Sequence, residues 1–255
     1  MKSLIIAIAG ATALSGAAFA AGESAPFPYS DVLNLENRTD EDRIRDPMRK
    51  PVEVLEFTGI QPGDTVLEME AGNGYFTTMI AHVVGEDGHV YLQAPANFIQ
   101  FWDTDTHPRM ANNSLPDQVE LLIADFYDMS AVPSDSVDVV TWMLGPHELW
   151  FTPDDRPEGF GDPDETFAEI FRVMRPSGSL ILLDHEAPEG APATTGGDTH
   201  RIASALVDGF AETAGFVEVA RSDLFSNPDD DRTLNVFTPE IRGRTDQFLI
   251  RYEKP

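Results

Sequence analysis

The stretch VLEMEAGNGYF at residues 66–76 decides how the rest of the chain is interpreted. An apolar strand pattern runs into a turn that contains Gly72 and Gly74, and an apolar helical pattern follows from Tyr75. Glycine permits positive φ and a close approach of backbone to ligand, and a helix N-terminus presents free N–H groups to an anion. The stretch predicts a cofactor-binding loop, with a tight structural turn as the alternative. Glu70 stands where such a loop normally has its first glycine.

Outward from this turn, strand patterns alternate with helix patterns. The expected strands lie at 65–69, 89–94, 119–125, 136–144, 179–185, 216–224 and 246–253. The expected helices lie at 52–60, 75–84, 164–174 and 199–214. Alternating elements predict βαβ units and a parallel sheet covered on both faces. The last two strands are joined by a long polar stretch without a helix pattern, so we expect them to pair antiparallel at one edge.

The first twenty residues have the features of an export signal. Lys2 precedes an apolar run, and Ala18-Phe19-Ala20 has the small-x-small pattern of a signal-peptidase site. The run is too short and too rich in alanine and glycine for a membrane span, although an uncleaved anchor is the alternative. We expect a signal peptide over 1–20, an N-terminal arm over 21–50, loose as far as residue 40, and one domain over 51–255. The mature protein is then periplasmic and free of the membrane.

Composition excludes several classes of function. The chain has no cysteine, which removes disulfides, thiolate metal sites and cysteine nucleophiles. Its formal net charge is −27, and such a surface repels nucleic acid and anionic membranes. Neither nucleic acid nor a membrane is therefore expected as a partner, and a polyanionic substrate is not expected either.

Four further pieces make the chain resemble the class I S-adenosylmethionine-dependent methyltransferases. They are PGDTVLEMEAGNGYFT (62–77), ADFYDM (124–129), SVDVVTWMLGPHEL (136–149) and FAEIFRVMRPSGSLILLDH (167–185), in the family's order and spacing. The tail pieces THRI (199–202), NPDDD (227–231) and IRGRTDQFLIRYEKP (241–255) resemble an exported group described as predicted methyltransferases. The resemblance implies an α/β, Rossmann-like doubly wound seven-stranded sheet, mostly parallel with an antiparallel C-terminal hairpin. It also implies S-adenosylmethionine as cofactor.

In an open α/β sheet the ligand lies beyond the carboxyl ends of the strands, where strand order reverses. The resemblance makes Glu68 the acidic residue near the amino-acid part of the cofactor, with Gly72 and Gly74 in the loop. A carboxylate at Glu70 favours the ammonium and sulfonium charges of the ligand and repels its carboxylate. A unit charge pair at about 4 Å is worth roughly 1–4 kcal/mol, enough to tune binding in either direction.

The residues implied for the nucleoside part depart from the family pattern at one position. An acid normally holds the ribose hydroxyls at the end of the second strand, where this chain offers Gln93 or Ala94. Glutamine can hydrogen-bond a hydroxyl but lacks the charge that strengthens the bond. Asp125 matches the position that contacts the adenine amino group, with Phe126 beside the ring. A loop or cap carboxylate is the alternative for Asp125.

His147 and His185 are the candidate catalytic residues. His147 follows the strand 136–144, and His185 ends the strand 179–185. Methyl transfer requires an aligned lone pair on the acceptor, and a base if the acceptor carries a proton. Histidine titrates near neutrality and suits that role. The alternative for His147 is a hydrogen-bonded structural histidine, with Glu148 orienting it or capping the next helix.

Together with Asp184 and His200, the two histidines raise the alternative of a Zn²⁺ or Fe²⁺ site. The spacing contains no local ligand motif such as H-x-x-x-H, so no metal is predicted. The favoured function is an exported S-adenosylmethionine-dependent methyltransferase acting on an unidentified small molecule. The alternative is a non-catalytic periplasmic ligand-binding protein on the same fold. Glu70, Gln93 and the cytosolic origin of S-adenosylmethionine motivate that alternative.

Overall fold

The computed structural model describes residues 27–99, 102, 108–112, 114–152 and 159–255. The expected signal peptide 1–20 and the beginning of the expected arm lie outside these ranges. None of the helices within them combines the length and the apolar character needed to cross a bilayer.

One seven-stranded sheet forms the centre of the protein, with strand order β3-β2-β1-β4-β5-β7-β6. The strands are β1 (Thr65–Met69), β2 (His89–Ala94), β3 (Val119–Ile123), β4 (Val137–Met143), β5 (Met174–His185), β6 (Val217–Ser222) and β7 (Gln247–Glu253). Strands β1 to β5 pair in parallel, whereas β7 lies antiparallel between β5 and β6. The predicted Rossmann-like, mostly parallel sheet with an antiparallel C-terminal pair is confirmed.

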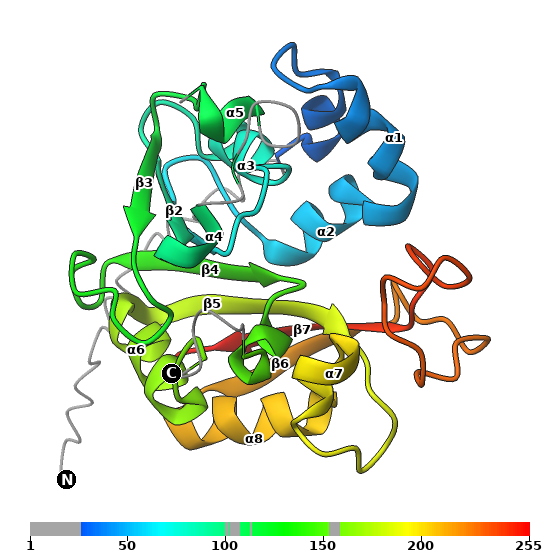
Figure 1. Cartoon of the computed structure of the whole chain (residues 1–255). Helices are drawn as coiled ribbons and strands as arrows, with labels where there is room; N and C mark the ends of the chain where they lie inside the picture. The colour runs from blue at the N-terminus through cyan, green and yellow to red at the C-terminus, as the bar shows by residue number, and fades with distance from the viewer. Residues whose placement is uncertain (1–26, 100–101, 103–107, 113, 153–158) are drawn as a thin grey trace, which may run out of the picture.

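Helices cover both faces of this sheet (Figure 1). They are η1 (Tyr29–Asn34), α1 (Asp40–Arg49), α2 (Pro51–Thr58), α3 (Thr77–Val84), α4 (Ala96–Ile99), α5 (Pro108–Ala111), η2 (Pro146–Trp150), α6 (Pro163–Val173), α7 (Thr195–Thr199) and α8 (Ser204–Ala214). One apolar core joins η1, α2 and α3 to one face of the sheet, and a second joins α6 and α8 to the other face. This is the doubly wound arrangement that alternating strands and helices produce.

Helix α6 shows how local sequence produces these elements. The Asp162 side chain accepts hydrogen bonds from the first backbone N–H groups, and Pro163 occupies the first turn, where no N–H is needed. Phe167, Ile170 and Val173 recur at helical spacing and are buried. The helix therefore begins and packs where the sequence predicts.

Strand β5 begins five residues earlier than expected, at Met174 instead of residue 179. Met174 pairs with Val137, and the register with β4 then shifts. Ser177 has φ +63°, and a Cβ on Gly178 would lie 2.9 Å from the carbonyl oxygen of Arg175. Residues 175–178, which fall between the expected helix and the expected strand, thus form an irregular start to the strand, which a periodicity argument does not detect.

The N-terminal arm is ordered where the structure describes it. The expectation of a loose segment is wrong for 29–34, which form η1 with Tyr29 and Val32 buried. The Tyr29 hydroxyl donates to the carbonyl of Ile60 at 2.6 Å, which fixes η1 against the end of α2. The boundary at residue 50 between arm and domain stays a prediction.

Strand order reverses between β1 and β4, because the chain first moves outward through β2 and β3 and then returns. The carboxyl ends of β1 and β4 therefore flank a crevice, as in other open α/β sheets. The glycine turn follows β1, and η2 follows β4 after Leu144 and Gly145. The candidate site is built on these two connections.

Candidate functional site

The glycine loop after β1 adopts the left-handed backbone that its glycines suggested. Gly72 has φ +58° and Gly74 has φ +73°. A Cβ on Gly72 would meet nothing within 4 Å, so only backbone conformation requires glycine there. A Cβ on Gly74 would also lie 2.9 Å from Met110 Cε. Helix α3 follows at Thr77 without a side-chain cap on its first turn, so its N–H groups face the end of the loop.

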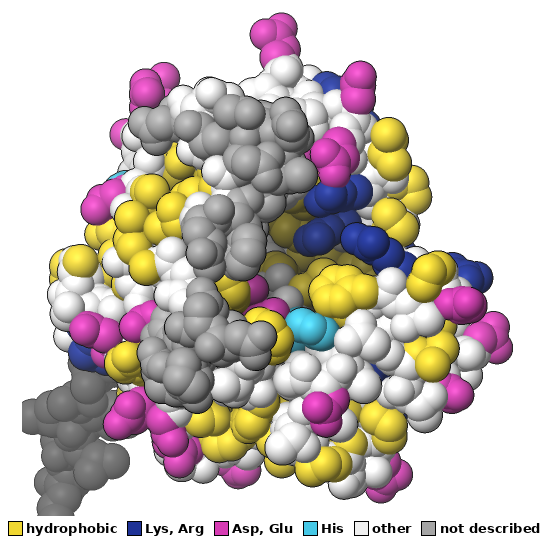
Figure 2. Space-filling view, viewed as in Figure 1, with side chains coloured by type: hydrophobic (Ala, Val, Ile, Leu, Met, Phe, Trp, Pro, Cys, Tyr) yellow, Lys and Arg dark blue, Asp and Glu magenta, His cyan; other side chains and the backbone are white. Residues whose placement is uncertain are grey.

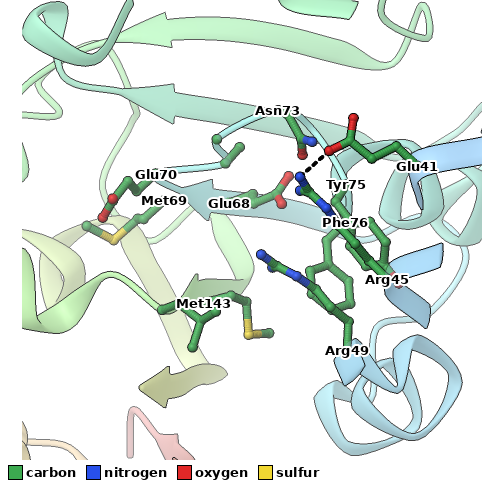
Figure 3. Close-up of a pocket in the computed structure, with 13 residues that line it drawn as sticks. Glu41, Arg45, Arg49, Glu68, Met69, Glu70, Asn73, Tyr75, Phe76 and Met143 are labelled. Carbon is green, nitrogen blue, oxygen red and sulfur yellow. Dashed lines mark hydrogen bonds and ion pairs between the residues drawn. The ribbon is translucent and has the colours of Figure 1, made fainter. Parts of the chain in front are cut away.

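Glu68 lies at the end of β1 in a cavity of about 390 Å³ that this loop borders. Burial raises the pKa of its carboxyl to about 8. The hydrogen bond that Thr77 Oγ1 donates at 2.5 Å and the positive charge of Arg49 lower that pKa, but burial outweighs both. Arg45 and Arg49 of α1 also line the cavity, on the side opposite Glu70 in Figure 3. The carboxyl groups of Glu41 and Glu68 and two guanidinium groups therefore surround the same space, and Glu41 pairs with Arg45.

Helix α1 is attached to the glycine loop by polar contacts. The Tyr75 hydroxyl donates to Asp46 Oδ1 at 2.6 Å. Arg109 pairs with Asp42 and donates to the carbonyl of Asn73 at 2.9 Å. These contacts explain why residues of the arm belong to the cavity. The sequence signal for them is the cluster of basic residues in DEDRIRDPMRKP (40–51), in a chain otherwise rich in acidic residues.

Glu70 has φ +52°, the conformation that glycine adopts without strain. Its carboxylate accepts a hydrogen bond from the Trp142 indole, Nε1–Oε2 3.2 Å, and in Figure 3 it lies apart from Glu68. Burial, and then the negative charge of Glu148, raise the pKa of Glu70 well above its usual value. Glu70 thus borders the cavity, and its carboxylate is hydrogen-bonded to a buried tryptophan.

The residues predicted for the nucleoside end differ in exposure. Gln93 is fully buried, accepts from the Glu70 N–H at 3.0 Å and donates to the Ala124 carbonyl at 2.6 Å. Phe126 is also fully buried, with its ring 4.8 Å from that of Trp142. Asp125 is half-buried beside them. Ligand contacts of Gln93, Asp125 and Phe126 stay predictions, and the structure gives Gln93 and Phe126 packing roles as well.

A second cavity of about 630 Å³ adjoins the first. The two share the walls formed by Arg45, Arg49, Phe76 and Leu144. The other apolar walls of the second cavity are Met48, Leu183, Phe225, Val236, Phe237 and Pro239. Figure 2 shows Lys and Arg side chains gathered beside a hollow that hydrophobic side chains line. A hollow with basic and apolar walls stands out in a protein whose net charge is −27.

His185 lines the second cavity, as expected for a residue at the end of β5. Burial lowers the pKa of its imidazole to about 4, with smaller contributions from neighbouring charges, so the ring is neutral at pH 7. Its Nδ1 lies 2.7 Å from Thr245 Oγ1. The other ring nitrogen, Nε2, is the one left for a ligand.

His147 lies in η2 next to the same crevice and is buried. Its Nδ1 is 2.8 Å from Asp184 Oδ1, and its Nε2 is 3.2 Å from His200 Nδ1. Burial lowers the pKa of His147, but Asp184 and Glu148 outweigh burial and raise it to about 10. Burial raises the pKa of Glu148, but His147 and His200 outweigh it and lower that pKa to about 2. Asp184, rather than Glu148, is thus the residue that orients His147.

These cavities occupy the crevice at the reversal of strand order, and the sequence profile described as "Methyltransferase domain" matches residues 60–207. The chain belongs to the methyltransferase domain family. The match covers β1 through the first residues of α8 and therefore both connections that build the crevice.

Relatives and solved structures agree with this assignment. The chain is 25% identical over 134 residues to the ubiquinone/menaquinone biosynthesis C-methyltransferase UbiE of Vibrio campbellii, covering 52% of this chain and 46% of the relative. It thus spans about half the length of that relative. A SAM-dependent methyltransferase from Aquifex aeolicus has TM-score 0.58 at 18% identity, covering 90% of this chain and 100% of that one. The geranyl diphosphate C-methyltransferase of Streptomyces coelicolor has TM-score 0.59 at 13% identity, covering 88% and 89%. These two structures share the fold.

The methyltransferase family and its structural neighbours support S-adenosylmethionine as the cofactor. The residues around the smaller cavity fit the amino-acid end of that molecule. A carboxyl group at Glu68 is a partner for its ammonium, and the guanidinium of Arg49 is a partner for its carboxylate. The space above Gly72 is open, so the ligand can approach the backbone there.

Proposed function

We propose that the chain is a methyltransferase that binds S-adenosylmethionine at the glycine loop and methylates a small molecule held in the larger cavity. The observation that carries this proposal is that the two cavities adjoin, because Arg45, Arg49, Phe76 and Leu144 line both. A cofactor anchored at Glu68 and an acceptor beside His185 would then lie next to each other where the two cavities adjoin. Bringing two reactants together in one orientation is the main requirement of an in-line transfer.

The chain's own residues would bind and align the two molecules. Glu68 and Arg49 hold the two charged ends of the amino-acid group. When bound, S-adenosylmethionine supplies an electrophilic methyl group. Where the acceptor carries a proton, Nε2 of His185 is placed to take it, since Nδ1 is occupied by Thr245. His147 acts less directly in this proposal, because its ring nitrogens face Asp184 and His200.

The lining of the larger cavity favours an acceptor with an apolar body and an acidic group. Its apolar walls suit a hydrocarbon or ring system. Arg242 lines this cavity with its guanidinium 5.9 Å from the centre of the Phe237 ring, and no ion pair neutralises it among the described residues. An anionic group on the acceptor would supply that missing partner. The relative from Vibrio campbellii is named as a C-methyltransferase, so carbon acceptors belong among the compounds to be tested.

We also propose that this methyltransferase acts in the periplasm after loss of residues 1–20. The support is the basic start at Lys2, the apolar run and the Ala18-Phe19-Ala20 pattern. N-terminal sequencing of the protein from a cell fractionation would test this. A chain that begins at Ala21 in the periplasmic fraction is expected, and an intact N-terminus in the cytosol would overturn it.

Cofactor binding is tested by titrating S-adenosylhomocysteine into the purified protein by calorimetry. We expect one site per chain, with affinity reduced about tenfold or more in Arg49→Gln, the range of a lost charge-assisted hydrogen bond. Arg43→Gln is the matched control, because Arg43 lies on the same helix and its side chain is 44% exposed, outside both cavities. No binding to the wild-type protein would overturn the methyltransferase proposal.

The acceptor class is tested separately with decanoate and decyl phosphate against the neutral decanol. We expect both anions to bind more tightly than decanol to the wild-type protein, and to lose that advantage in Arg242→Gln, which changes the larger cavity alone. Binding of the anions without any binding of S-adenosylhomocysteine would favour the non-catalytic ligand-binding alternative. Equal binding of all three probes would contradict an acidic acceptor.

A further inference from the structure

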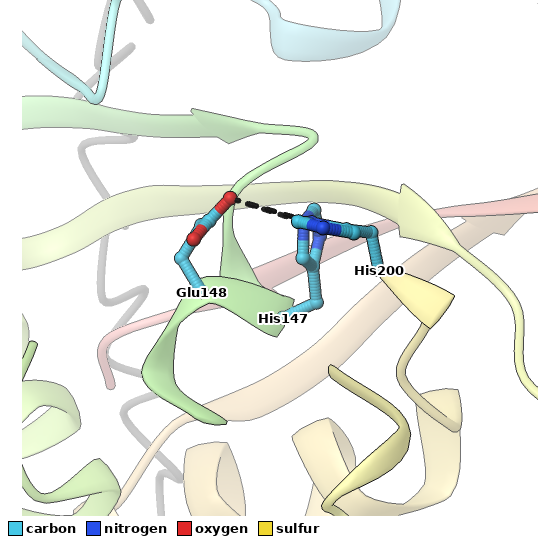
Figure 4. Close-up of side chains that lie close together, drawn as sticks. All are labelled: His147, Glu148 and His200. Atoms are coloured by element: carbon cyan, nitrogen blue, oxygen red, sulfur yellow. Dashed lines mark hydrogen bonds and ion pairs between the residues drawn. The ribbon is translucent and has the colours of Figure 1, made fainter. Parts of the chain in front are cut away.

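We infer that His147, Glu148 and His200 form a binding site for a divalent metal ion, with Zn²⁺ as the ion that their chemistry favours. The three side chains come from η2 and from the residue that follows α7, and they converge on one point (Figure 4). The inference concerns the metal alone and does not depend on the proposed methyl transfer.

The separations between the three candidate ligand atoms match a metal centre. Nε2 of His147 lies 3.2 Å from Nδ1 of His200 and 3.3 Å from Oε1 of Glu148, and the last two atoms are 3.7 Å apart. These three distances place a point equidistant from all three atoms about 2.0 Å from each, and Zn²⁺ bonds to nitrogen and oxygen measure about 2.0–2.2 Å. An ion at about 2.1 Å from each atom lies roughly 0.7 Å out of their plane, as a tetrahedral centre does, and keeps its fourth position open.

Asp184 supplies the outer support that metal-binding histidines commonly have. Its carboxylate is fully buried and lies 2.8 and 3.0 Å from Nδ1 of His147. It also accepts the backbone N–H of His147 at 2.7 Å. Because this carboxylate holds a proton on Nδ1, Nε2 is the ring nitrogen that would exchange its proton for the candidate ion. A carboxylate that orients a histidine in this way raises its basicity as a ligand.

Within the described part of the chain, one atom of the cluster lacks a partner, and the cluster is otherwise held by ring protons that an ion would replace. Two imidazole nitrogens and one carboxylate oxygen face one another across less than 4 Å. The remaining oxygen of Glu148, Oε2, is buried and has no hydrogen-bond partner among the described residues. Buried polar atoms without partners are rare in folded proteins. A divalent ion would neutralise the carboxylate and pair with all three groups at once.

Two glycines bring α7 close enough for His200 to reach η2. A Cβ on Gly196 would lie 2.5 Å from the carbonyl oxygen of His147, and a Cβ on Gly197 would lie 2.6 Å from that of Trp150. His200 itself has φ +54°, a conformation that non-glycine residues adopt infrequently. The backbone thus holds the third candidate ligand in place before any ion arrives.

The candidate metal site borders the larger cavity. The ring centres of His200 and Phe237 are 4.9 Å apart, and the ring centres of His147 and His185 are 6.2 Å apart. Phe237 and His185 are both walls of the cavity. An open coordination position on this side would accept an oxygen of a small molecule in the cavity.

Two imidazole nitrogens and one carboxylate oxygen, with no thiolate, are a known ligand set for catalytic Zn²⁺. Fe²⁺ accepts the same set with more open positions, whereas Ca²⁺ and Mg²⁺ prefer oxygen ligands alone. The absence of cysteine from the chain makes this nitrogen-rich cluster the better candidate for a zinc ion than any thiolate site.

The test is a calorimetric titration of Zn²⁺ into the full chain after removal of metal with a chelator. We expect one ion per chain. We expect at least a hundredfold loss of affinity in His200→Ala and Glu148→Gln, and a 10- to 100-fold loss in Asp184→Asn, which removes the outer support. His89→Ala is the control, because His89 and Glu120 form a surface pair at 3.3 Å with exposed side chains.

Cobalt substitution provides a second readout that does not depend on any variant. Co²⁺ bound to the wild-type chain should give the visible absorption bands of a four- or five-coordinate centre, and Zn²⁺ should displace it. Failure of the wild-type chain to bind either ion would overturn the inference, leaving a hydrogen-bonded charge cluster. So would a Zn²⁺ affinity that His200→Ala and Glu148→Gln leave unchanged in variants whose circular dichroism is native.

Discussion

The indole N–H of Trp142 donates to the carboxylate of Glu70, with 3.2 Å between Nε1 and Oε2. The acidic residue that replaces the first glycine of the cofactor loop therefore interacts with a core tryptophan of β4. A Cβ on Gly145 would lie 2.3 Å from Glu70 Oε2, so Gly145 provides the space that this carboxylate occupies. The departure from the family pattern is accommodated within the protein.

The first prediction concerns this carboxylate. Glu70→Gln keeps an oxygen acceptor for Trp142 and removes only a group whose pKa burial already raises. We expect its affinity for S-adenosylhomocysteine to stay within about threefold of wild type, and its stability to be equal or higher. Calorimetry and thermal unfolding measure both. A large gain in affinity, in Glu70→Gln or in Glu70→Gly, would mean that the natural loop rejects the cofactor.

Glu68 should make stability depend on pH. Burial raises the pKa of Glu68 to about 8, above the value of 4.5 for the unfolded chain. Between these values the folded state binds the extra proton, so its stability falls as pH rises from about 5 to 8. Glu68→Gln removes this dependence. Relative to the wild type, we expect it to gain stability on the order of 2–4 kcal/mol between pH 5 and pH 8, as measured by urea unfolding.

The comparison isolates Glu68, because Glu70 titrates in both proteins and cancels in the difference. A parallel pH dependence of the two proteins would show that Glu68 is ionised in the folded state across this range. That result would place a positive partner, such as Arg49, closer to the carboxyl group than its present position.

The contact between Tyr75 and Asp46 should couple the arm to the cofactor. Tyr75→Phe removes the 2.6 Å hydrogen bond that ties α1 to the glycine loop. We expect a loss of stability of about 1 kcal/mol, the net value of one hydrogen bond, and a few-fold weaker affinity for S-adenosylhomocysteine because Arg45 and Arg49 lie on α1. Unfolding and calorimetry report the two effects. Unchanged cofactor affinity would show that α1 contributes nothing to the cofactor site.

The Lys254 side chain should make a large contribution to the free energy of unfolding. Its ammonium lies 2.6 Å from Asp135 Oδ1, 2.8 Å from the carbonyl oxygen of Phe171 and 2.7 Å from that of Met174. We expect Lys254→Met to cost about 2–4 kcal/mol in urea unfolding, because hydrogen bonds to a buried charge are lost together. Asp135→Asn is the control, since the Asp135 side chain is 59% exposed, and it should cost less than about 1 kcal/mol.

Much of the fold could be predicted from local pattern. Strand β2 has the bounds 89–94 expected from its apolar pattern, and α6 differs from expectation by one residue at each end. The early start of β5 and the ordered arm could not be predicted. The first depends on an irregular backbone around Ser177, and the second on Tyr29 reaching Ile60, a contact across 31 residues.

For the candidate site too, some residues could be located from the sequence and others could not. Glu68 lies near the end of a predicted strand and Gly72 and Gly74 follow that strand, so the sequence alone located them at the crevice. The meeting of His147 with His200 depends on the folding together of segments 53 residues apart, and spacing rules for local metal motifs do not detect it. The burial of Gln93 was also beyond prediction, because it depends on the carbonyl of Ala124 in a neighbouring segment.

The segment 223–246 covers the larger cavity with Phe225, Val236 and Phe237, and it forms turns and bends without a helix or strand. Its ends are fixed on β6 and β7, which are neighbours in the sheet. A connection of this kind tolerates changes in length at small entropic cost. In evolutionary terms, descendants of this fold could acquire a different methyl acceptor by exchanging one surface segment, while the glycine loop and the sheet stay as they are.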